Sequence, residues 1–305
     1  MDELQRNLLK NISDIEGVPT GAYNLRLNGK AAERHSSANI EIVPKTDKSG
    51  IDIIVKPNTR NERVDIPVLL TETGLNDLVY NDFYIGEGAD VLIVAGCGIH
   101  NCGNSDSQHD GIHAFHISRG AKVKYVEKHY GEGDGNGRRT LNPTTEIYID
   151  ENGYMEMDSV QIKGVDSTMR KTIAKLSAGA TLVVHEKIMT HGQQVATTDF
   201  DVALNGDGAG AHVVSRSVAK DDSRQTFISC VDGNARCTGH TECDAIVMDN
   251  AHVGAIPKVN ANNTEASLVH EAAIGKIAGE QLDKLMTLGL TQKEAEEKII
   301  EGFLK

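Results

Sequence analysis

The sequence lacks the side chains on which nucleic acid usually binds. Tryptophan is absent, and aromatic residues make up only 4% of the chain. Proteins that stack bases use aromatic side chains for this purpose. The formal net charge is -13, and no long basic run interrupts it. Because an acidic surface repels phosphate backbones, we expect no nucleic-acid partner.

Long hydrophobic runs are also missing. No stretch of 18 or more apolar residues occurs, which excludes a membrane-spanning helix by the usual length criterion. The first residues, MDELQRNLLKNISDI, lack the continuous apolar segment of a secretory signal peptide. We therefore expect a cytoplasmic protein with no membrane contact.

Several catalytic motifs are absent as well. The sequence has no GxxxxGK[ST], no GxSxG and no HExxH, so an ATP-binding Walker A loop, a serine nucleophile elbow and a zincin site are not supported. His185-Glu186 and His270-Glu271 are bare dipeptides without a second histidine. We expect no catalytic residues and no enzyme. A polysaccharide lyase or hydrolase remains an alternative, because spacing alone does not reveal a pair of catalytic carboxylates.

The cysteines are few and irregularly spaced. The chain has five, with no CxxC pair: Cys97, Cys102, Cys230, Cys237 and Cys243. An odd number without paired spacing predicts no disulfide framework and no standard zinc site. The segment 97–116 adds the histidines His100, His109, His113 and His116. Since His113 and His116 would face opposite sides of a strand, a polar ladder or a transfer path is favoured over a metal site.

Alternating hydrophobicity dominates from about residue 39 to residue 260. Segments such as GIDIIVK and AKVKYVEK predict many short strands, separated by Gly, Asn or Asp turns. Gly-Ala or Asn-Ala precedes strands at 120, 179, 210, 234 and 250, which favours a β-solenoid. A β-sandwich is the alternative, because Asn-Gly pairs typical of hairpins occur at 28, 136, 152 and 205. The segment GEGDGNG at 131–137 predicts a mobile loop.

Both ends of the chain show helical spacing instead. The N-terminal apolar stripe consists of Leu4, Leu8, Leu9, Ile12 and Ile15. Near the C-terminus, the segment 279–288 predicts one helix, and Thr291 with Glu294 forms a capping box that opens a second. We therefore predict an N-terminal helical segment over 1–20, a β core over 21–268 and a C-terminal helical region over 269–305.

The C-terminal third carries a family resemblance. The run from ECDAIVMD through IPKVNANNTEASLVHEAAIGKI to the last helix, with GADVLIVAGCGIHN and AKVKYVEKHY upstream, resembles the SufB/SufD family and in particular its short, archaeal-type SufB-like members. The resemblance implies a right-handed parallel β-helix with a short N-terminal helical segment and a C-terminal helical hairpin. It also implies a scaffold that assembles and transfers a transient iron–sulfur cluster. The implied partners are a second copy of the chain, joined through the β-helix, a SufC-type ABC ATPase, and apo iron–sulfur proteins as recipients.

The resemblance also implies roles for individual residues. Cys243 matches the cluster cysteine, and His270 and Glu271 match a His-Glu pair of non-thiolate ligands that we expect where strand gives way to helix. Cys97 matches a cysteine linked to sulfur entry, with Lys128 on the strand that lines the path. Docking of the ATPase would use apolar residues of the last two helices: Leu282, Leu285, Leu290 and Ile299.

The chain departs from the bacterial pattern in two respects. Lys128 and Tyr130 stand where the family has glutamine and tryptophan, so the sulfur path is expected to differ. The region linked to flavin has no counterpart, which makes flavin doubtful. An adaptor that only binds the ATPase and carries no cluster of its own is a further alternative.

Overall fold

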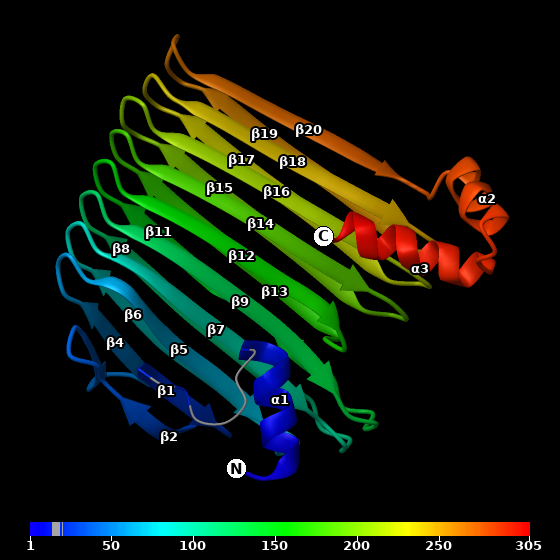
Figure 1. Cartoon of the computed structure of the whole chain (residues 1–305), viewed down its shortest axis with the longest axis horizontal. Coiled ribbons are helices and arrows are strands. Elements are labelled where there is room, and N and C mark those ends of the chain that lie inside the picture. Colours follow the sequence, from blue (N-terminus) through cyan, green and yellow to red (C-terminus); the bar gives the residue numbers. More distant parts are fainter. Residues whose placement is uncertain (14–18, 20) are drawn as a thin grey trace.

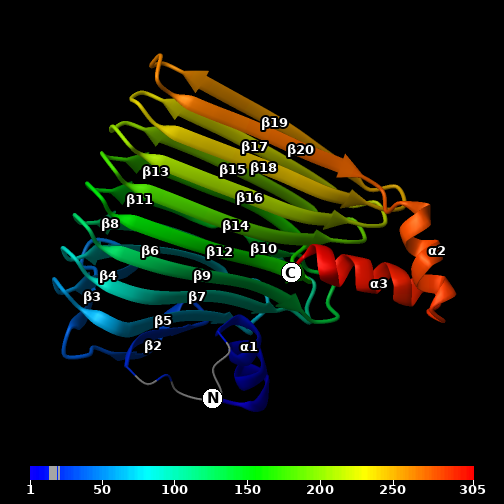
Figure 2. The ribbon, with the colours of Figure 1, turned by 45° about the horizontal axis from the view of Figure 1, so that its top comes forward.

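Parallel strand pairing defines the architecture of the computed structural model, which describes residues 1–13, 19 and 21–305. Successive long strands alternate between two ten-stranded sheets, here called sheet A and sheet B, so that the chain winds as a β-solenoid of about eight turns (Figures 1 and 2). The predicted parallel β-helix is confirmed. The β-sandwich alternative is wrong, because antiparallel pairs in the described chain are confined to β1 with β2 and β3 with β4.

The strands of the two sheets have the following bounds. Sheet A contains β1 (Ala22–Leu27), β2 (Lys30–His35), β5 (Arg60–Leu70), β7 (Asp90–His100), β9 (Lys122–Glu132), β12 (Tyr154–Lys163), β14 (Thr181–Thr190), β16 (Gly210–Ala219), β18 (Thr238–Val247) and β20 (Ser267–Gly275). Sheet B contains β3 (Ile40–Pro44), β4 (Gly50–Val55), β6 (Asn76–Ile85), β8 (Ser107–Ile117), β10 (Arg139–Leu141), β11 (Thr144–Ile149), β13 (Ser167–Leu176), β15 (Val195–Leu204), β17 (Arg224–Gly233) and β19 (His252–Ala261). The helices are α1 (Glu3–Ser13), α2 (Gly279–Thr287) and α3 (Gln292–Phe303).

Each strand sends alternate side chains into the space between the sheets. In β14 every second residue from Leu182 onward is buried, as the two-residue period of a strand requires. Side chains of successive turns then stack on each other: the rings of Phe83 and Phe115 lie 4.3 Å apart and nearly parallel. Each such buried apolar side chain stabilises the fold by about 1.5–3 kcal/mol relative to an exposed one.

The Gly-Ala pairs that precede strands in the sequence lie at the corners of the solenoid. Gly120 and Gly179 adopt φ values of +64° and +65°, which glycine tolerates without a steric penalty. The alanines that follow them, Ala121 and Ala180, are completely buried and begin the next inward row. Among the Asn-Gly pairs, the one at Asn28 turns an antiparallel hairpin, between β1 and β2.

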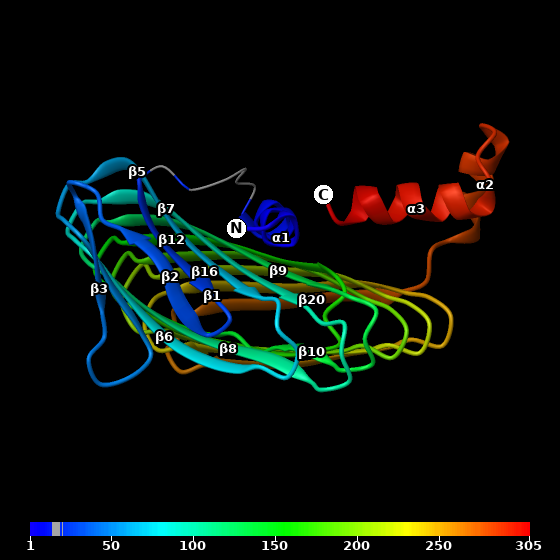
Figure 3. The same cartoon turned by 90° about the horizontal axis from the view of Figure 1, so that it is seen from below.

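Helix α1 covers the outer face of sheet A at the N-terminal end of the solenoid (Figure 3). Its stripe residues Leu8 and Ile12 are fully buried, so this part of the predicted helix is confirmed. Gly96 of β7 permits the close approach, because a Cβ there would lie 2.4 Å from the backbone oxygen of Ile12. Ile15 and the other predicted residues at 14–18 and 20 lie outside the described residues.

At the other end, the chain leaves sheet A only after Gly275. Strand β20 therefore crosses the predicted boundary at 268, and the helical region begins at Gly279. The capping box of α3 is present, since the Thr291 side chain and the Glu294 side chain each bind the other's backbone N–H. In the described chain, no helix combines the length and the apolar character that crossing a membrane requires.

Candidate functional site: the last turns of the solenoid

Cys243 and His270 face the interior of the solenoid from neighbouring strands. Cys243 lies in the middle of β18 and is 1% exposed. The parallel register pairs Thr241 with His270 and Cys243 with Ala272. Because residues two apart on a strand share a face, His270 and Cys243 lie on the same inner face, one step apart along the strands.

Glu271 faces the opposite way. The expectation that His270 and Glu271 lie where strand gives way to helix is wrong, since β20 continues through both residues to Gly275. Adjacent residues of an extended strand point to opposite faces, so Glu271 lies on the outer surface. There its carboxylate is 3.6 Å from the ring of His240, and it groups with Glu242 as a set of side chains that could hold a metal ion.

The surroundings of Cys243 keep its thiol protonated. Burial raises its pKa to about 12, with the negative charges of Glu186 and Asp244 adding to the effect. Glu186 is itself fully buried and accepts hydrogen bonds from Ser215 at 2.7 Å and Thr198 at 3.0 Å. Because a thiol must lose its proton to bind a metal, ligation by Cys243 requires a compensating positive charge such as the metal itself.

His270 is arranged as a neutral imidazole. Its Nδ1 lies 2.6 Å from the hydroxyl of Thr241, and burial together with the nearby His240 lowers its pKa. The other ring nitrogen, Nε2, has no hydrogen-bond partner among the described residues. A neutral imidazole in which one nitrogen is hydrogen-bonded and the other has no partner is the form that binds metal ions.

A single copy of the chain does not bring these three donors to one point. Cys243 and His270 face inward and Glu271 faces outward, so the set does not fit a cluster within one protomer. However, β20 is the last strand of sheet A and pairs only with β18, which leaves its other edge without a strand among the described residues. Additional ligands can therefore come from a molecule that meets this edge.

Cys97 also lies in the interior, whereas Lys128 does not. The Cys97 thiol is 6% exposed on β7, inside the N-terminal half of the solenoid. Strand β9 buries Glu127 and His129 and turns Lys128 to the outer face. Lys128, predicted to lie on the strand that lines a sulfur path, thus points away from the interior, and its two neighbours occupy the inner positions.

A row of buried polar side chains runs between the two cysteines. Arg170, 1% exposed, forms an ion pair with Glu127, lies 3.0 Å from Nδ1 of His129 and 3.4 Å from a carboxylate oxygen of Glu186. Burial opposes the charge of Glu127, but His129 and Arg170 lower its pKa to about 2. Such buried charges are tolerated only when they are paired, as they are here.

Sequence reasoning missed this row, although the pattern was available. Glu127 and His129 are two residues apart in an alternating strand and so share one face with the apolar Tyr125. The outer histidines were missed in the same way. His212 and His240 are neighbours in register, and their rings lie 5.0 Å apart because one turn of the solenoid separates them.

Comparison with known proteins shows the family to which the chain belongs. Residues 80–303 match the SufBD core domain of the SUF system for FeS cluster assembly. The chain belongs to the SufBD family. It is 30% identical to an iron–sulfur cluster assembly SufBD family protein of Methanocaldococcus jannaschii, over 77% of this chain and 74% of that protein.

Two further SufBD relatives show how the lengths compare. The match to a protein of Pyrococcus horikoshii is 26% identical and covers 96% of this chain and 84% of the relative. A SufBD protein of Methanothermobacter thermautotrophicus is 30% identical over 74% of this chain, and there the match spans only 54% of the relative. The chain thus spans about half the length of some SufBD relatives and most of the length of others.

The histidines on β8 of this SufBD protein lie on both faces of sheet B. His113 is buried and bonds the Tyr125 hydroxyl at 2.8 Å, whereas His116 lies on the outer face between Tyr84 and Tyr148, with ring spacings of 5.0 and 5.3 Å. The predicted opposite orientation of His113 and His116 is confirmed. At the corner before β8, Cys102 is exposed.

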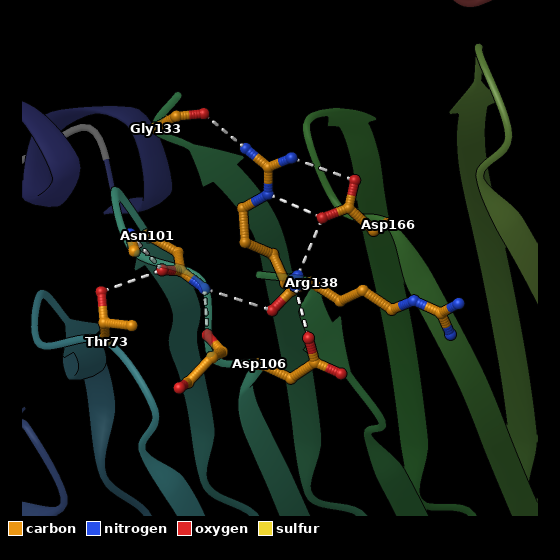
Figure 4. A network of polar contacts seen from close by, with 9 residues as sticks. Thr73, Asn101, Asp106, Gly133, Arg138 and Asp166 are labelled. Atoms are coloured by element: carbon orange, nitrogen blue, oxygen red, sulfur yellow. Dashed lines mark hydrogen bonds and ion pairs between the residues drawn. The ribbon is translucent and has the colours of Figure 1, made fainter. Parts of the chain in front are cut away.

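The glycine-rich segment 131–137 ends β9 and forms the predicted loop over 133–137, and this loop packs against the preceding turn. Cβ atoms at Gly133 and Gly135 would lie 2.3 Å from backbone oxygens of the preceding turn. Figure 4 shows polar contacts that hold this corner, in which the Asn101 side chain bonds Thr73 and the backbone of neighbouring loops. In the same corner, Arg139 forms an ion pair with Asp166.

The predicted ATPase-binding residues fall into two groups. Leu282, Leu285 and Leu290 are half-buried on or beside α2, a helix with no fully buried residue. Ile299 instead packs within the chain, in a cluster formed with Val218, Ile246 and Ile300 beneath α3. The most exposed apolar side chain of this region, Leu288 at 76%, was not among the predicted residues.

Proposed function

We propose that this SufBD protein is a scaffold on which iron–sulfur clusters are assembled as cargo and then passed to apo proteins. The observation that carries the proposal is the position of Cys243. It is a buried thiol one strand away from the open edge of sheet A, on the same face as the open nitrogen of His270. A thiolate is the standard protein ligand of iron–sulfur clusters.

A homodimer completes the ligand set in this proposal. Each protomer offers Cys243 and His270 on the inner face near its last turn, which is too few for a cluster with thiolate ligands throughout. Pairing two copies at the ends of their solenoids would bring two such sets together. Imidazole and carboxylate ligands such as His270 and Glu271 hold iron less tightly than thiolates, which suits a cluster that has to be released.

Sulfur would enter at Cys97 and reach Cys243 through the interior. The buried polar row of His113, Glu127, Arg170 and Glu186 supports this route, because it lines the inner face between the two cysteines. The outward-facing Lys128 does not belong to this route. Energy for opening the dimer would come from an ABC-type ATPase bound to α2 and α3, since the sequence itself has no Walker A motif.

The test is anaerobic reconstitution with ferrous iron and sulfide, followed by visible absorption spectroscopy. Wild type is expected to develop charge-transfer absorption, and Cys243→Ala is expected to lose it. Cys230→Ala is the matched control, because Cys230 is a half-buried thiol on the outer face of sheet B. Absorption that survives in Cys243→Ala would refute the assignment. A wild type that binds the ATPase but never develops absorption would favour the adaptor alternative.

A further inference from the structure

An exposed thiol stands beside an imidazole at the corner that follows β7. Among the five cysteines, all in the described part of the chain, only Cys102 is exposed. Its sulfur lies 2.9 Å from Nε2 of His100, the last residue of β7. On the neighbouring strand β9, Glu132 pairs in register with His100, and a carboxylate oxygen lies 3.4 Å from Nδ1 of the same ring. Thiol, imidazole and carboxylate thus follow one another in a row.

The two ring nitrogens of His100 have different surroundings. A carboxylate accepts hydrogen bonds and cannot donate them, so the neutral ring carries its proton on Nδ1, toward Glu132. This leaves Nε2 as the acceptor that faces the Cys102 thiol. The Tyr130 hydroxyl donates to the other carboxylate oxygen of Glu132 at 3.0 Å and holds it in place. Nucleophile, base and orienting carboxylate stand in the order that thiol and hydroxyl nucleophiles require.

The loop that carries Cys102 is held by buried contacts on both sides. Asn101 is completely buried, and its side-chain oxygen accepts hydrogen bonds from the Thr73 hydroxyl at 2.9 Å and from the Gly103 N–H at 3.0 Å (Figure 4). On the next turn, a Cβ at Gly135 would lie 2.5 Å from the backbone carbon of Cys102. The backbone on either side of Cys102 is therefore fixed, which keeps the sulfur beside the base.

A second carboxylate favours proton transfer during the reaction over a free thiolate before it. A hydrogen bond from Cys102 lowers the pKa of Asp134, in the loop that follows β9. The negative charge of Asp134 opposes a negative charge on the sulfur. The thiol proton therefore has to pass to His100 as the sulfur attacks, which is general-base catalysis.

The surroundings of the thiol favour sulfur over carbon as the atom that it attacks. Attack on an ester or amide carbonyl requires N–H donors for the oxyanion, and the residue after the nucleophile commonly supplies one. Here that N–H, from Gly103, is already bonded to Asn101. Exchange with a disulfide forms no oxyanion and requires only an accessible sulfur nucleophile.

We propose that Cys102 is a site of thiol–disulfide exchange, with His100 as the base and a low-molecular-weight disulfide as the substrate. The Cys102 sulfur attacks one sulfur of R–S–S–R, the S–S bond of the disulfide breaks, and the leaving R–S⁻ takes the proton from His100. Cys102 is oxidised to the mixed disulfide Cys–S–S–R, and the other sulfur of the substrate is reduced to R–SH. This modification goes beyond the proposed function, because Cys102 belongs neither to the cluster ligands nor to the sulfur route described above.

The first test compares two thiols of one molecule. Glutathione disulfide serves as the probe at pH 7, and mass spectrometry of the cysteine peptides, after alkylation of unreacted thiols, follows each rate. Cys230 is the matched thiol: it is half-buried, contacts the Asn260 amide at 4.0 Å, and has its pKa raised by burial and by Asp232. We expect Cys102 to react at least about ten-fold faster than Cys230. Comparable rates at the two thiols would overturn the proposal.

Substitution of the base separates catalysis from mere exposure. His100→Gln should slow the modification of Cys102 at least about ten-fold and leave the rate at Cys230 unchanged. His185→Gln is the matched control, because it removes an imidazole that lies 3.0 Å from the Asp158 carboxylate and bonds no cysteine in the described structure. It should react at the wild-type rate. A His100→Gln protein that keeps the wild-type rate at Cys102 would refute the role of the imidazole and with it the proposal.

Glu132 is a positioning residue in this proposal, and its substitution needs a readout of structural damage. Glu132→Gln should slow the modification of Cys102 by a smaller factor than His100→Gln does. Loosening of the fold would instead open the buried thiols to the same probe, namely Cys97, Cys237 and Cys243. Slower modification of Cys102 while these three stay unmodified would support the role of Glu132. An unchanged rate, or slowing accompanied by modification of the buried thiols, would refute it.

Discussion

The two ends of the solenoid differ in whether the chain itself covers them. At the N-terminal end, α1 and the β1–β2 hairpin cover the first turns, and Leu8, Leu9 and Ile12 are completely buried. At the C-terminal end, β19 and β20 form the last turn with no element stacked on them in the described chain (Figures 1 and 2). Solenoid proteins require a cap at each end to remain soluble. The N-terminal end is therefore capped by the chain itself, whereas the last turn at the C-terminal end is uncovered in the described chain, which fits the proposal that a second copy of the chain covers it.

The exposed apolar side chains of the last turn support this interpretation. Val259 on β19 and Ile274 on β20 lie at inward positions of their strands, yet each is 41% exposed because no further turn covers it. Edge strands with apolar side chains are prone to pair with other chains. In the proposed dimer, the second copy that covers this end would also enclose Cys243 and His270, which lie on the last two strands of sheet A.

The largest expected effect follows from charging the open end. Val259→Asp combined with Ile274→Asp should dissociate the proposed dimer, raising its dissociation constant at least about 100-fold, or roughly 3 kcal/mol. The free energy of unfolding of the protomer should change little, because both side chains are already partly exposed. Sedimentation velocity and denaturant unfolding measure the two quantities. A wild type that is monomeric at high micromolar concentration would contradict the proposal that a second copy covers the C-terminal end.

Mutation at the capped N-terminal end should lower the stability of the protomer and leave the oligomeric state unchanged. Ile12→Ala removes a fully buried side chain from the contact between α1 and β7 and should lower the free energy of unfolding by about 2–4 kcal/mol without changing oligomeric state. Asn11→Ala, on the exposed side of the same helix, is the control and should stay within about 0.5 kcal/mol. Equal effects of the two substitutions in urea unfolding would show that α1 does not act as a cap.

The sequence predicts local structure better than it predicts the direction in which single side chains point, and the reason is physical. Strand alternation, corner glycines and the capping box of Thr291 are local patterns, and each was predicted correctly. The direction in which Glu271 and Lys128 point depends on the strand register and on where β20 ends, neither of which a local pattern fixes. A family resemblance assigned both residues to the site, but only the register shows that they face outward.

The buried polar row could not be assembled from the sequence at all. Arg170 reaches Glu127 across a separation of 43 residues and from the opposite sheet, so no spacing rule connects them. Such contacts arise from the winding of the chain. Charged residues in alternating strands can be recognised as inward-facing, but their partners require the three-dimensional fold.

Acid should weaken the middle of the solenoid more than its ends. Burial keeps His129 neutral and lowers its pKa to about 3, whereas in the unfolded chain it titrates near 6.5. Below about pH 6.5 the unfolded chain binds one more proton than the folded chain, so stability falls as the pH decreases toward 3. The expected slope is roughly 1 kcal/mol per pH unit for this group. His129→Gln should reduce that slope in urea unfolding between pH 6.5 and 4, and an unchanged slope would contradict the assignment.

The smallest effect on stability, and the most informative for partner binding, concerns the C-terminal helices. Leu288→Asp alters a side chain that is 76% exposed and should change the free energy of unfolding by less than about 0.5 kcal/mol. If the ATPase docks on α2, this substitution should still weaken its binding about ten-fold or more, because an apolar contact is replaced by a charge.

Ile299→Asp should weaken binding only together with a loss of stability, because Ile299 packs against the β-solenoid beneath α3. Titration calorimetry with the ATPase, alongside urea unfolding of each variant, separates these cases. Binding that survives Leu288→Asp but is lost in a stably folded Ile299→Asp would move the docking surface from α2 to α3.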